Sequence, residues 1–192
     1  IEKLPMTPFE LSVELQDLFG AAAKQLAPGS WQVETSDYRL LVLLSDDQSW
    51  LRVLVPIAPA QDAQPFFEQL LEANFDRTQE VRYALQQEVL WAVFQHSLAG
   101  LTVADFQSVA TRLIELRHKG LDESFNRLIE NRVRQIIRAS KQQGQSLEAT
   151  LQTLERFYQE GLMGDMAAST QAREDTLAAW RYQLERLWNE GE

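Results

Sequence analysis

Hydrophobic residues near the start of the chain recur at helical spacing. Thr7-Pro8-Phe9-Glu10 offers an N-cap hydroxyl, a proline at the first helical position and a carboxylate three residues after the cap. The apolar positions that follow lie three or four residues apart and are Leu11, Leu15, Leu18, Ala22 and Leu26. Because one face of a helix repeats at this spacing, the pattern predicts a single helix that runs to Pro28-Gly29.

Beyond Trp31 the apolar residues alternate with polar ones, which is the period of a β-strand. Polar turn residues divide this stretch into three expected strands, Trp31–Thr35, Leu40–Leu44 and Trp50–Ile57. Two more expected strands, Val81–Leu85 and Val89–Leu98, follow later in the chain. Together these segments predict a five-stranded antiparallel sheet.

Two further helices are expected, one before and one after the last two strands. Asp62 is a candidate N-cap for a helix with an apolar face made of Phe66, Phe67, Leu70, Leu71 and Phe75. Thr102-Val103-Ala104-Asp105 is a second capping sequence, and Gly120 stands where a glycine ends a helix. We therefore predict an α+β domain over residues 1–120 with the order α-β-β-β-α-β-β-α.

In the rest of the chain, residues 121–192, the hydrophobic pattern predicts helices only. Ser140–Ser146 is a polar linker, and the apolar positions around it fit three amphipathic helices. These positions are Phe125, Ile129, Val133 and Ile136, then Leu147, Leu151, Leu154 and Tyr158, then Leu177, Trp180, Leu184, Leu187 and Trp188. We expect this helical region to pack on the α+β domain or on a second subunit.

Two of the expected strands are apolar on both faces. Leu40–Leu44 contains no polar residue, and Trp91 and Val93 point away from the apolar residues that alternate with them. The three predicted helices before residue 121 can cover only one face of the sheet, so the other face needs the C-terminal helices or a second subunit. Trp91 and Val93 are therefore candidate interface residues, and a homodimer is one expected assembly.

This order of elements resembles the type III secretion chaperone-like fold, including an uncharacterised group of such proteins associated with cyanobacteria. The resemblance is one of topology and covers about the first two-thirds of the chain. It implies small acidic dimers that bind partner polypeptides and catalyse no reaction. No functional residue carries over, and the long helical C-terminal region departs from the family pattern.

The charge balance narrows the range of partners. The formal net charge is -10, so the protein as a whole repels nucleic acids and anionic membranes. Cysteine is absent, which excludes disulfides and thiolate metal sites. No stretch is long and apolar enough to span a bilayer, and Ile1-Glu2-Lys3-Leu4 is not a signal-peptide pattern. We expect a cytoplasmic protein that binds neither nucleic acid nor membrane.

Motifs for catalysis are missing from the sequence. The eight glycines form no phosphate-binding loop, and two histidines without cysteine offer few ligands to a transition metal. We therefore expect no cofactor, no metal and no enzymatic activity. The alternative is a small-ligand-binding regulator or enzyme that uses His96, placed in an apolar strand, with nearby acidic residues. A histidine satisfied within the core explains the same pattern.

Positive charge gathers on the first C-terminal helix. Arg127, Arg134, Arg138 and Lys141 fall on one helical stripe, which is a candidate binding site for an acidic polypeptide or a phosphate group. A solvated helix face, or pairing with the protein's own acidic C-terminal residues, explains the same pattern. Arg132 projects toward the apolar side of this helix, and we expect it to snorkel or to form a buried ion pair.

Trp180 and Trp188 share the apolar stripe of the last helix. Tryptophans at such positions pack in a core or anchor an interface, and both interpretations are open. The leading hypothesis is a non-enzymatic protein-binding or chaperone-like assembly factor with a polypeptide partner. A structural subunit of a larger complex is a further alternative.

Overall fold

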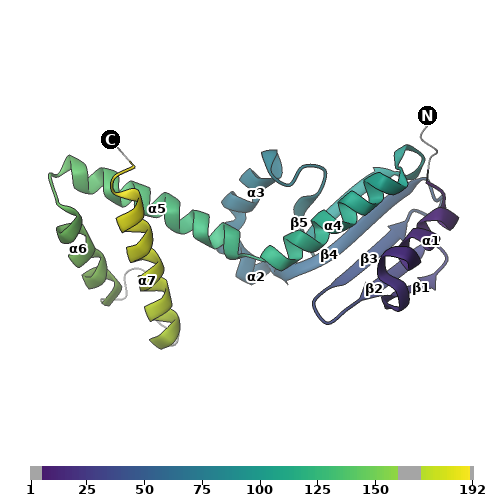
Figure 1. Cartoon of the computed structure of the whole chain (residues 1–192), viewed down its shortest axis with the longest axis horizontal. Helices are drawn as coiled ribbons and strands as arrows, with labels where there is room; N and C mark the ends of the chain where they lie inside the picture. Colours follow the sequence, from purple (N-terminus) through teal and green to yellow (C-terminus); the bar gives the residue numbers. More distant parts are fainter. Residues whose placement is uncertain (1–5, 160–169, 191–192) are drawn as a thin grey trace. The chain divides into compact units, whose positions relative to one another are not determined.

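The computed structural model describes residues 6–159 and 170–190 and divides the chain into two compact units, Ile1–Ser124 and Phe125–Glu192. The N-terminal unit combines helices with a six-stranded antiparallel sheet in the order β1-β2-β3-β4-β6-β5 (Figure 1). The described part of the C-terminal unit is helical. The predicted α+β class is confirmed, but the sheet has six strands and not five.

The sheet is a run of antiparallel neighbours. Its strands are β1 (Ala23–Ala27), β2 (Ser30–Glu34), β3 (Arg39–Leu44), β4 (Trp50–Pro59), β5 (Arg82–Gln86) and β6 (Val89–Ser97). β6 inserts between β4 and β5, so β1 and β5 are the edge strands. The register sets Val53 of β4 opposite both Val42 and Phe94, which gives one face of the sheet a continuous apolar row.

The sixth strand, β1, is formed by residues that the sequence pattern assigned to the first helix, which is shorter than predicted. α1 (Pro8–Phe19) begins with the predicted capping box, in which Thr7 and Glu10 bond to each other's backbone N–H groups. It ends at Gly20, where φ is +55°, and the short 3-10 turn η1 (Gly20–Ala22) leads into β1. The prediction of one helix through Leu26 was wrong, because pairing with β2 gives the backbone of residues 23–27 its hydrogen-bond partners.

The second predicted helix is broken into shorter pieces. It consists of α2 (Ala60–Ala63), the 3-10 turn η2 (Gln64–Phe66) and α3 (Phe67–Asp76). Pro65 lies in η2, where its missing N–H cannot support a regular helix. Asp62 lies inside α2, whose N-cap is Pro59, so its predicted capping role was wrong.

The last helix of this unit follows its sequence signals. After the 3-10 turn η3 (Leu98–Gly100), α4 (Val103–Lys119) begins with a capping box between Thr102 and Asp105. It ends at Gly120, whose φ of +53° favours glycine. Both predicted ends of this helix are confirmed.

All four helices of the N-terminal unit share one core with one face of the sheet. Leu11 of α1, Ala63 of α2, Leu70 of α3 and Phe106 of α4 belong to a single buried cluster. α1 and α4 pack on the same side of the sheet (Figure 1). The buried strand residues of this cluster include Val33, Leu40, Val42, Leu51, Val53, Val55, Ala92 and Phe94.

The C-terminal unit has a separate core. Its helices are α5 (Asp122–Gln142), which begins just before the unit boundary, α6 (Leu147–Gln159) and α7 (Thr170–Leu187). The buried residues are Ile129, Val133, Ile137, Leu154, Trp180, Leu184 and Leu187. The side chain of Tyr158, predicted to join this core, lies outside the described residues.

Candidate functional site

The face of the sheet opposite the helices carries its own apolar side chains. Strand alternation places Leu41 and Leu43 of β3, Leu54 of β4, and Trp91 and Val93 of β6 on this open face. The register sets Leu54 opposite both Leu41 and Val93. Val93 is only 7% exposed, yet it does not belong to the core cluster under the helices. The open face therefore has an apolar centre of its own.

The open face is hollowed where β4, β6 and β5 lie side by side. A cavity of about 610 Å³, open to solvent, is lined by residues of these strands and by the turn between β5 and β6. Its apolar lining residues are Leu54, Ala84, Leu85, Trp91 and Val93. The indole Nε1 of Trp91 donates to the carbonyl oxygen of Gln86 at 3.1 Å, which fixes the ring against the edge strand.

The charged residues of this hollow are arginines. Arg52 of β4 and Arg82 of β5 both line it, and both are exposed. Arg82 Nη2 donates to Gln95 Oε1 at 2.9 Å, and Gln95 lies opposite Arg52 in the register. No carboxylate belongs to the lining, and within residues 6–159 and 170–190 neither arginine has an ion pair.

The charge of the hollow contrasts with that of the unit around it. Residues 1–124 contain nine Lys and Arg against eighteen Asp and Glu, a net charge of -9, whereas residues 125–192 contain nine against ten. The hollow is therefore a positively charged site in the more acidic part of the chain. Such a local potential attracts a negatively charged group while the rest of the unit repels it.

A strained turn closes one end of the hollow. Gln87 and Glu88 connect β5 to β6 with φ values of +48° and +59°, as in a type I′ turn, although neither residue is Gly, Asn or Asp. Each such residue costs about 1 kcal/mol of backbone strain. The Glu88 carbonyl oxygen accepts from Ala60 N at 2.8 Å, which helps to hold the turn in place.

A second hollow of about 470 Å³ lies beside the turn between β2 and β3. It contains acids and bases together, and Arg39 Nη2 binds Glu34 Oε1 at 2.7 Å. This hydrogen bond lowers the pKa of the Glu34 carboxyl. Because it mixes acids and bases, two of which already pair, this hollow selects ligand charge less well than the one on the open face.

His96 lies on the covered side of the sheet and not in either hollow. Its ring is half-buried, stacks on Phe94 with centroids 5.8 Å apart, and contacts the Ser97 carbonyl oxygen through Nδ1 at 2.7 Å. This is the polar contact that the described residues provide for the ring. Within residues 6–159 and 170–190 the ring forms no hydrogen bond or ion pair with an acidic side chain, so its contacts lend the enzyme alternative no support.

Metal binding and membrane insertion find no support in the described residues. Across the parts of the chain that the structure describes, no three His, Asp or Glu side chains gather in a group that could hold a metal ion. No helix in those same parts is both long enough and apolar enough to cross a membrane.

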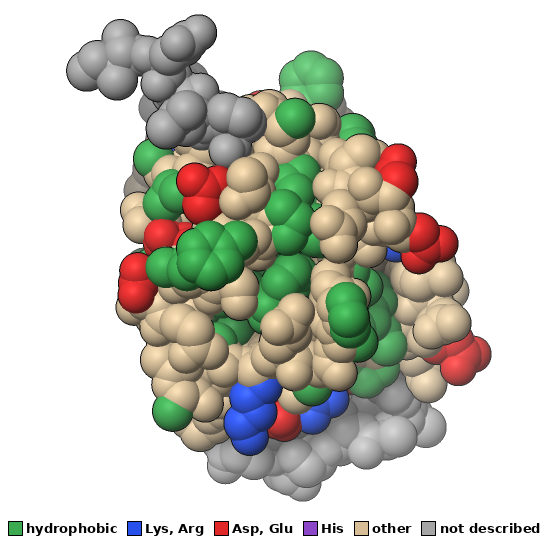
Figure 2. Space-filling model, turned by 90° about the vertical axis from the view of Figure 1, so that its right-hand side faces the viewer, with side chains coloured by type: hydrophobic (Ala, Val, Ile, Leu, Met, Phe, Trp, Pro, Cys, Tyr) green, Lys and Arg blue, Asp and Glu red, His purple; other side chains and the backbone are tan. Residues whose placement is uncertain are grey.

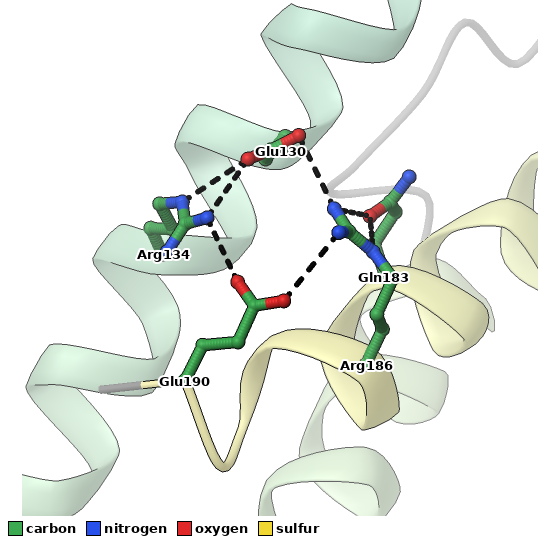
Figure 3. A network of polar contacts seen from close by, with 5 residues as sticks. All are labelled: Glu130, Arg134, Gln183, Arg186 and Glu190. Carbon is green, nitrogen blue, oxygen red and sulfur yellow. Dashed lines mark hydrogen bonds and ion pairs between the residues drawn. The ribbon is translucent and has the colours of Figure 1, made fainter. Parts of the chain in front are cut away.

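The predicted cationic stripe is partly used inside the C-terminal unit. Arg134 binds Glu130 Oε1 through Nη2 at 2.9 Å and Glu190 Oε2 at 3.1 Å, and Arg186 bridges to the same two acids (Figure 3). The hydrogen bond that Arg134 donates to Glu130 raises the pKa of the Arg134 guanidinium. Lys141 lies 5.6 Å from the centre of the Trp188 ring, a cation–π distance. Two members of the stripe therefore stabilise their own unit.

The remaining candidate residues of the C-terminal unit differ in how exposed they are. Arg138 is exposed, and Arg127 is half-buried with contacts of its own. Arg132 is exposed, so the buried ion pair, one of the two environments predicted for it, is excluded, whereas a snorkelling side chain keeps its guanidinium in water. Trp180 is 3% exposed inside the core, and Trp188 packs half-buried against that core.

The sequence did not single out Arg52, Arg82, Leu54 or Gln95. The available signal was alternation: Arg52 and Leu54 share a strand face, and so do Val93 and Gln95. Alternation assigns residues to faces, but only the register brings four residues from three strands together. Arg52 and Arg82 are thirty positions apart in the chain, so no local pattern joins them.

The chain resembles type III secretion chaperones in structure. No protein-family model matches it, and no curated protein matches it. The Yersinia pestis type III secretion chaperone SycH, solved with a stable fragment of YscM2, matches at 15% identity and a TM-score of 0.47 over 59% of this chain and 99% of that one. The ExoU–SpcU complex of Pseudomonas aeruginosa matches at 14% identity and 0.47, over 58% and 95%.

A third similar structure, the ExsC–ExsE complex, matches at 13% identity and a TM-score of 0.47, over 60% of this chain and 96% of that one. Similarity at this level describes a common arrangement of elements and assigns no function. The function of this chain has to be argued from its own surfaces.

Proposed function

We propose that this protein binds a polypeptide, without catalysing a reaction, and that the open face of its sheet holds the bound segment. One observation carries the proposal: the open face bears an apolar centre, with Trp91 and Val93 in a hollow of about 610 Å³. Apolar surface of this kind, rimmed by polar residues, is characteristic of interaction sites. A chaperone-like or assembly role is consistent with such a site.

The nature of the surface favours a polypeptide over a small metabolite. The lining is spread over three neighbouring strands and mixes apolar, amide and guanidinium groups. An extended chain presents side chains at regular intervals and can contact such a surface along its length. A small-molecule site is instead concave with convergent titratable groups, and His96, the candidate general base, lies on the other side of the sheet.

Single apolar residues elsewhere on the unit support the proposal less well. Phe9 and Leu26 are exposed, and hydrophobic side chains reach the surface between polar ones on the side that α1 and β1 flank (Figure 2). Leu71 and Phe75, on the outer surface of α3, are 68% and 92% exposed. Isolated exposed apolar residues are common in proteins, and none of these lines either of the two hollows described above.

A random twelve-residue peptide library, displayed on phage and selected against the full-length protein, tests this function. We expect selected peptides whose synthetic copies bind the wild type and lose at least tenfold in affinity with Trp91→Ser. Leu71→Ser, an exposed apolar change on α3, is the matched control and should leave Kd unchanged. Circular dichroism and thermal melting establish that both variants are folded.

Selection of no peptide, or of peptides indifferent to Trp91→Ser, contradicts the proposal. A thermal shift produced by a small metabolite that Trp91→Ser abolishes would assign the face to a small ligand instead.

A further inference from the structure

The open face carries two positively charged side chains in addition to the apolar residues on which the proposed function rests. Arg52 and Arg82 line the hollow without a carboxylate among its lining residues. In the described residues, the guanidinium of Arg82 donates to a neutral amide, that of Gln95. The unit around them carries twice as many acidic as basic residues. The unit therefore contains many acidic residues, but none of them lines this hollow.

Resting on the proposed function, we propose that the polypeptide held on this face is an extended acidic segment whose carboxylates pair with Arg52 and Arg82. Guanidinium groups bind carboxylates in a fixed fork geometry, with two parallel N–H donors. A hollow that offers two such groups and no competing acid is complementary to Asp or Glu side chains. Basic segments are disfavoured there by the same two charges.

The sheet register sets the spacing of those carboxylates. Arg52 lies opposite Gln95, Arg82 lies opposite Val93, and these two partners are two residues apart on β6. With strands about 4.8 Å apart and a rise of about 3.3 Å per residue, the two arginine Cα atoms are separated by about 12 Å. Positions i and i+4 of an extended segment are separated by about 13 Å and point to the same side.

The residue between these two carboxylates has its own surroundings. Position i+2 points to the same side as i and i+4 and falls between the arginines, over β6 midway between Val93 and Gln95. Val93 is buried among its neighbours, and Leu54 lies opposite it. An apolar side chain therefore fits position i+2, so the expected segment alternates acidic, apolar and acidic residues on its inward side.

The peptide library described above also tests this inference when it is selected in parallel on an Arg52→Gln/Arg82→Gln variant. The control is Arg112→Gln/Lys119→Gln, which removes the same charge from α4, where the two residues pair with Glu80 and Glu123. We expect peptides selected on the wild type and the control to be enriched in Asp and Glu, and those selected on the first variant not to be.

Affinity measurements on synthetic copies give the size of the effect. Arg52→Gln/Arg82→Gln should weaken an acidic peptide about tenfold, since each exposed pair contributes somewhat under 1 kcal/mol. The control pair should change Kd less than twofold, and replacing both peptide acids by Gln should reproduce the loss on the wild type. Raising the salt concentration should weaken the acidic peptides only.

The outcomes separate the two proposals. Peptides that need Trp91 but show no acidic enrichment, or that bind the arginine variant equally well, overturn the acidic segment and leave polypeptide binding in place. Absence of any peptide that depends on Trp91 overturns both. Displacement of acidic peptides by inorganic phosphate at matching affinity would assign the arginines to a free anion and overturn the inference.

Discussion

At the scale of single residues, the turn between β3 and β4 is held by one carboxylate. Asp47 Oδ1 accepts hydrogen bonds from Ser45 Oγ at 2.6 Å and from Ser49 N and Oγ at 3.1 and 2.8 Å. These bonds lower the pKa of the Asp47 carboxyl from 3.8 to about 2, the Ser45 hydroxyl contributing most. The polar run of residues 45–49 predicts a turn, but only the folded geometry identifies which acid organises it.

Asp47 should make stability depend on acid pH. Its folded-state pKa is below the unfolded value, so its contribution is present above about pH 4 and is lost as the pH falls toward 2. NMR titration of the side-chain carboxyl should give a midpoint near pH 2. Ser45→Ala/Ser49→Ala should raise that midpoint, and a wild-type midpoint near 3.8 would contradict the interpretation.

Asn74 protects the exposed edge of the sheet. Its Oδ1 accepts from Tyr83 N at 2.8 Å, and its Nδ2 donates to the Tyr83 carbonyl oxygen at 3.0 Å. The side-chain amide thus takes the place of a neighbouring strand on β5. Burial raises the pKa of the Tyr83 phenol to about 12, consistent with a tightly packed edge residue.

Asn74→Ala should lower the free energy of unfolding by about 1–3 kcal/mol, because it leaves two partly buried backbone groups of β5 without a partner. Urea unfolding measures the effect. Asn126→Ala, at an exposed position of α5, is the matched control and should change stability by less than about 0.5 kcal/mol. Equal effects of the two substitutions would show that the Asn74 bonds contribute nothing.

At the scale of elements, the β5–β6 turn is built from residues that disfavour it. Gln87 and Glu88 both have positive φ, and a type I′ turn prefers Asn-Gly at these positions. Gln87→Asn/Glu88→Gly should therefore raise the free energy of unfolding by about 1–2 kcal/mol, with the Glu88 carbonyl contact to Ala60 retained.

Urea unfolding of the turn variant and of a contrasting Gln87→Val/Glu88→Val variant checks this. The valine pair should destabilise the protein, because β-branched side chains tolerate positive φ poorly. Failure of the Asn-Gly variant to exceed wild-type stability would mean that the turn relaxes at no cost.

In β1, pairing with β2 overrides the helical pattern of the local sequence. Ala21, Ala22 and Ala23 favour helix, and the apolar spacing of α1 continues through Leu26. The chain nevertheless leaves the helix at Gly20, and Lys24 and Gln25 lie opposite Gln32 and Trp31 of β2. Each strand residue gains ladder hydrogen bonds only when β2 is in place, and the helical spacing of residues 11–26 does not report on that partner.

At the scale of the whole molecule, the two units have separate cores. One buried cluster runs from Met6 to Leu116, and the other from Ile129 to Leu187. Each core has its own large, fully buried side chains, Phe106 in the first and Leu184 in the second. A unit with its own core is expected to fold by itself.

Residues 1–124 should therefore fold as an isolated fragment. This fragment retains Glu123, which pairs with Lys119 and Arg77. We expect a dispersed amide NMR spectrum and a cooperative urea transition. The charge of -9 predicts that the fragment is stabilised by added salt, which screens its self-repulsion. A collapsed spectrum without dispersion would show that the sheet needs residues beyond 124.

The sequence by itself determined the α+β class, five of the six strands, both capping boxes and the assignment of Trp91 and Val93 to one strand face. These features depend on period, capping chemistry and turn residues, which act over a few positions. Tertiary structure alone decided that residues 23–27 form a strand, that Arg134 joins Glu130 and Glu190, and that Arg52 and Arg82 share a hollow. The strand depends on pairing with β2, and the other two outcomes bring together residues far apart in the chain, Arg134 with Glu190 and Arg52 with Arg82. The register or packing that brings such residues together is a property of the whole sheet or helical unit.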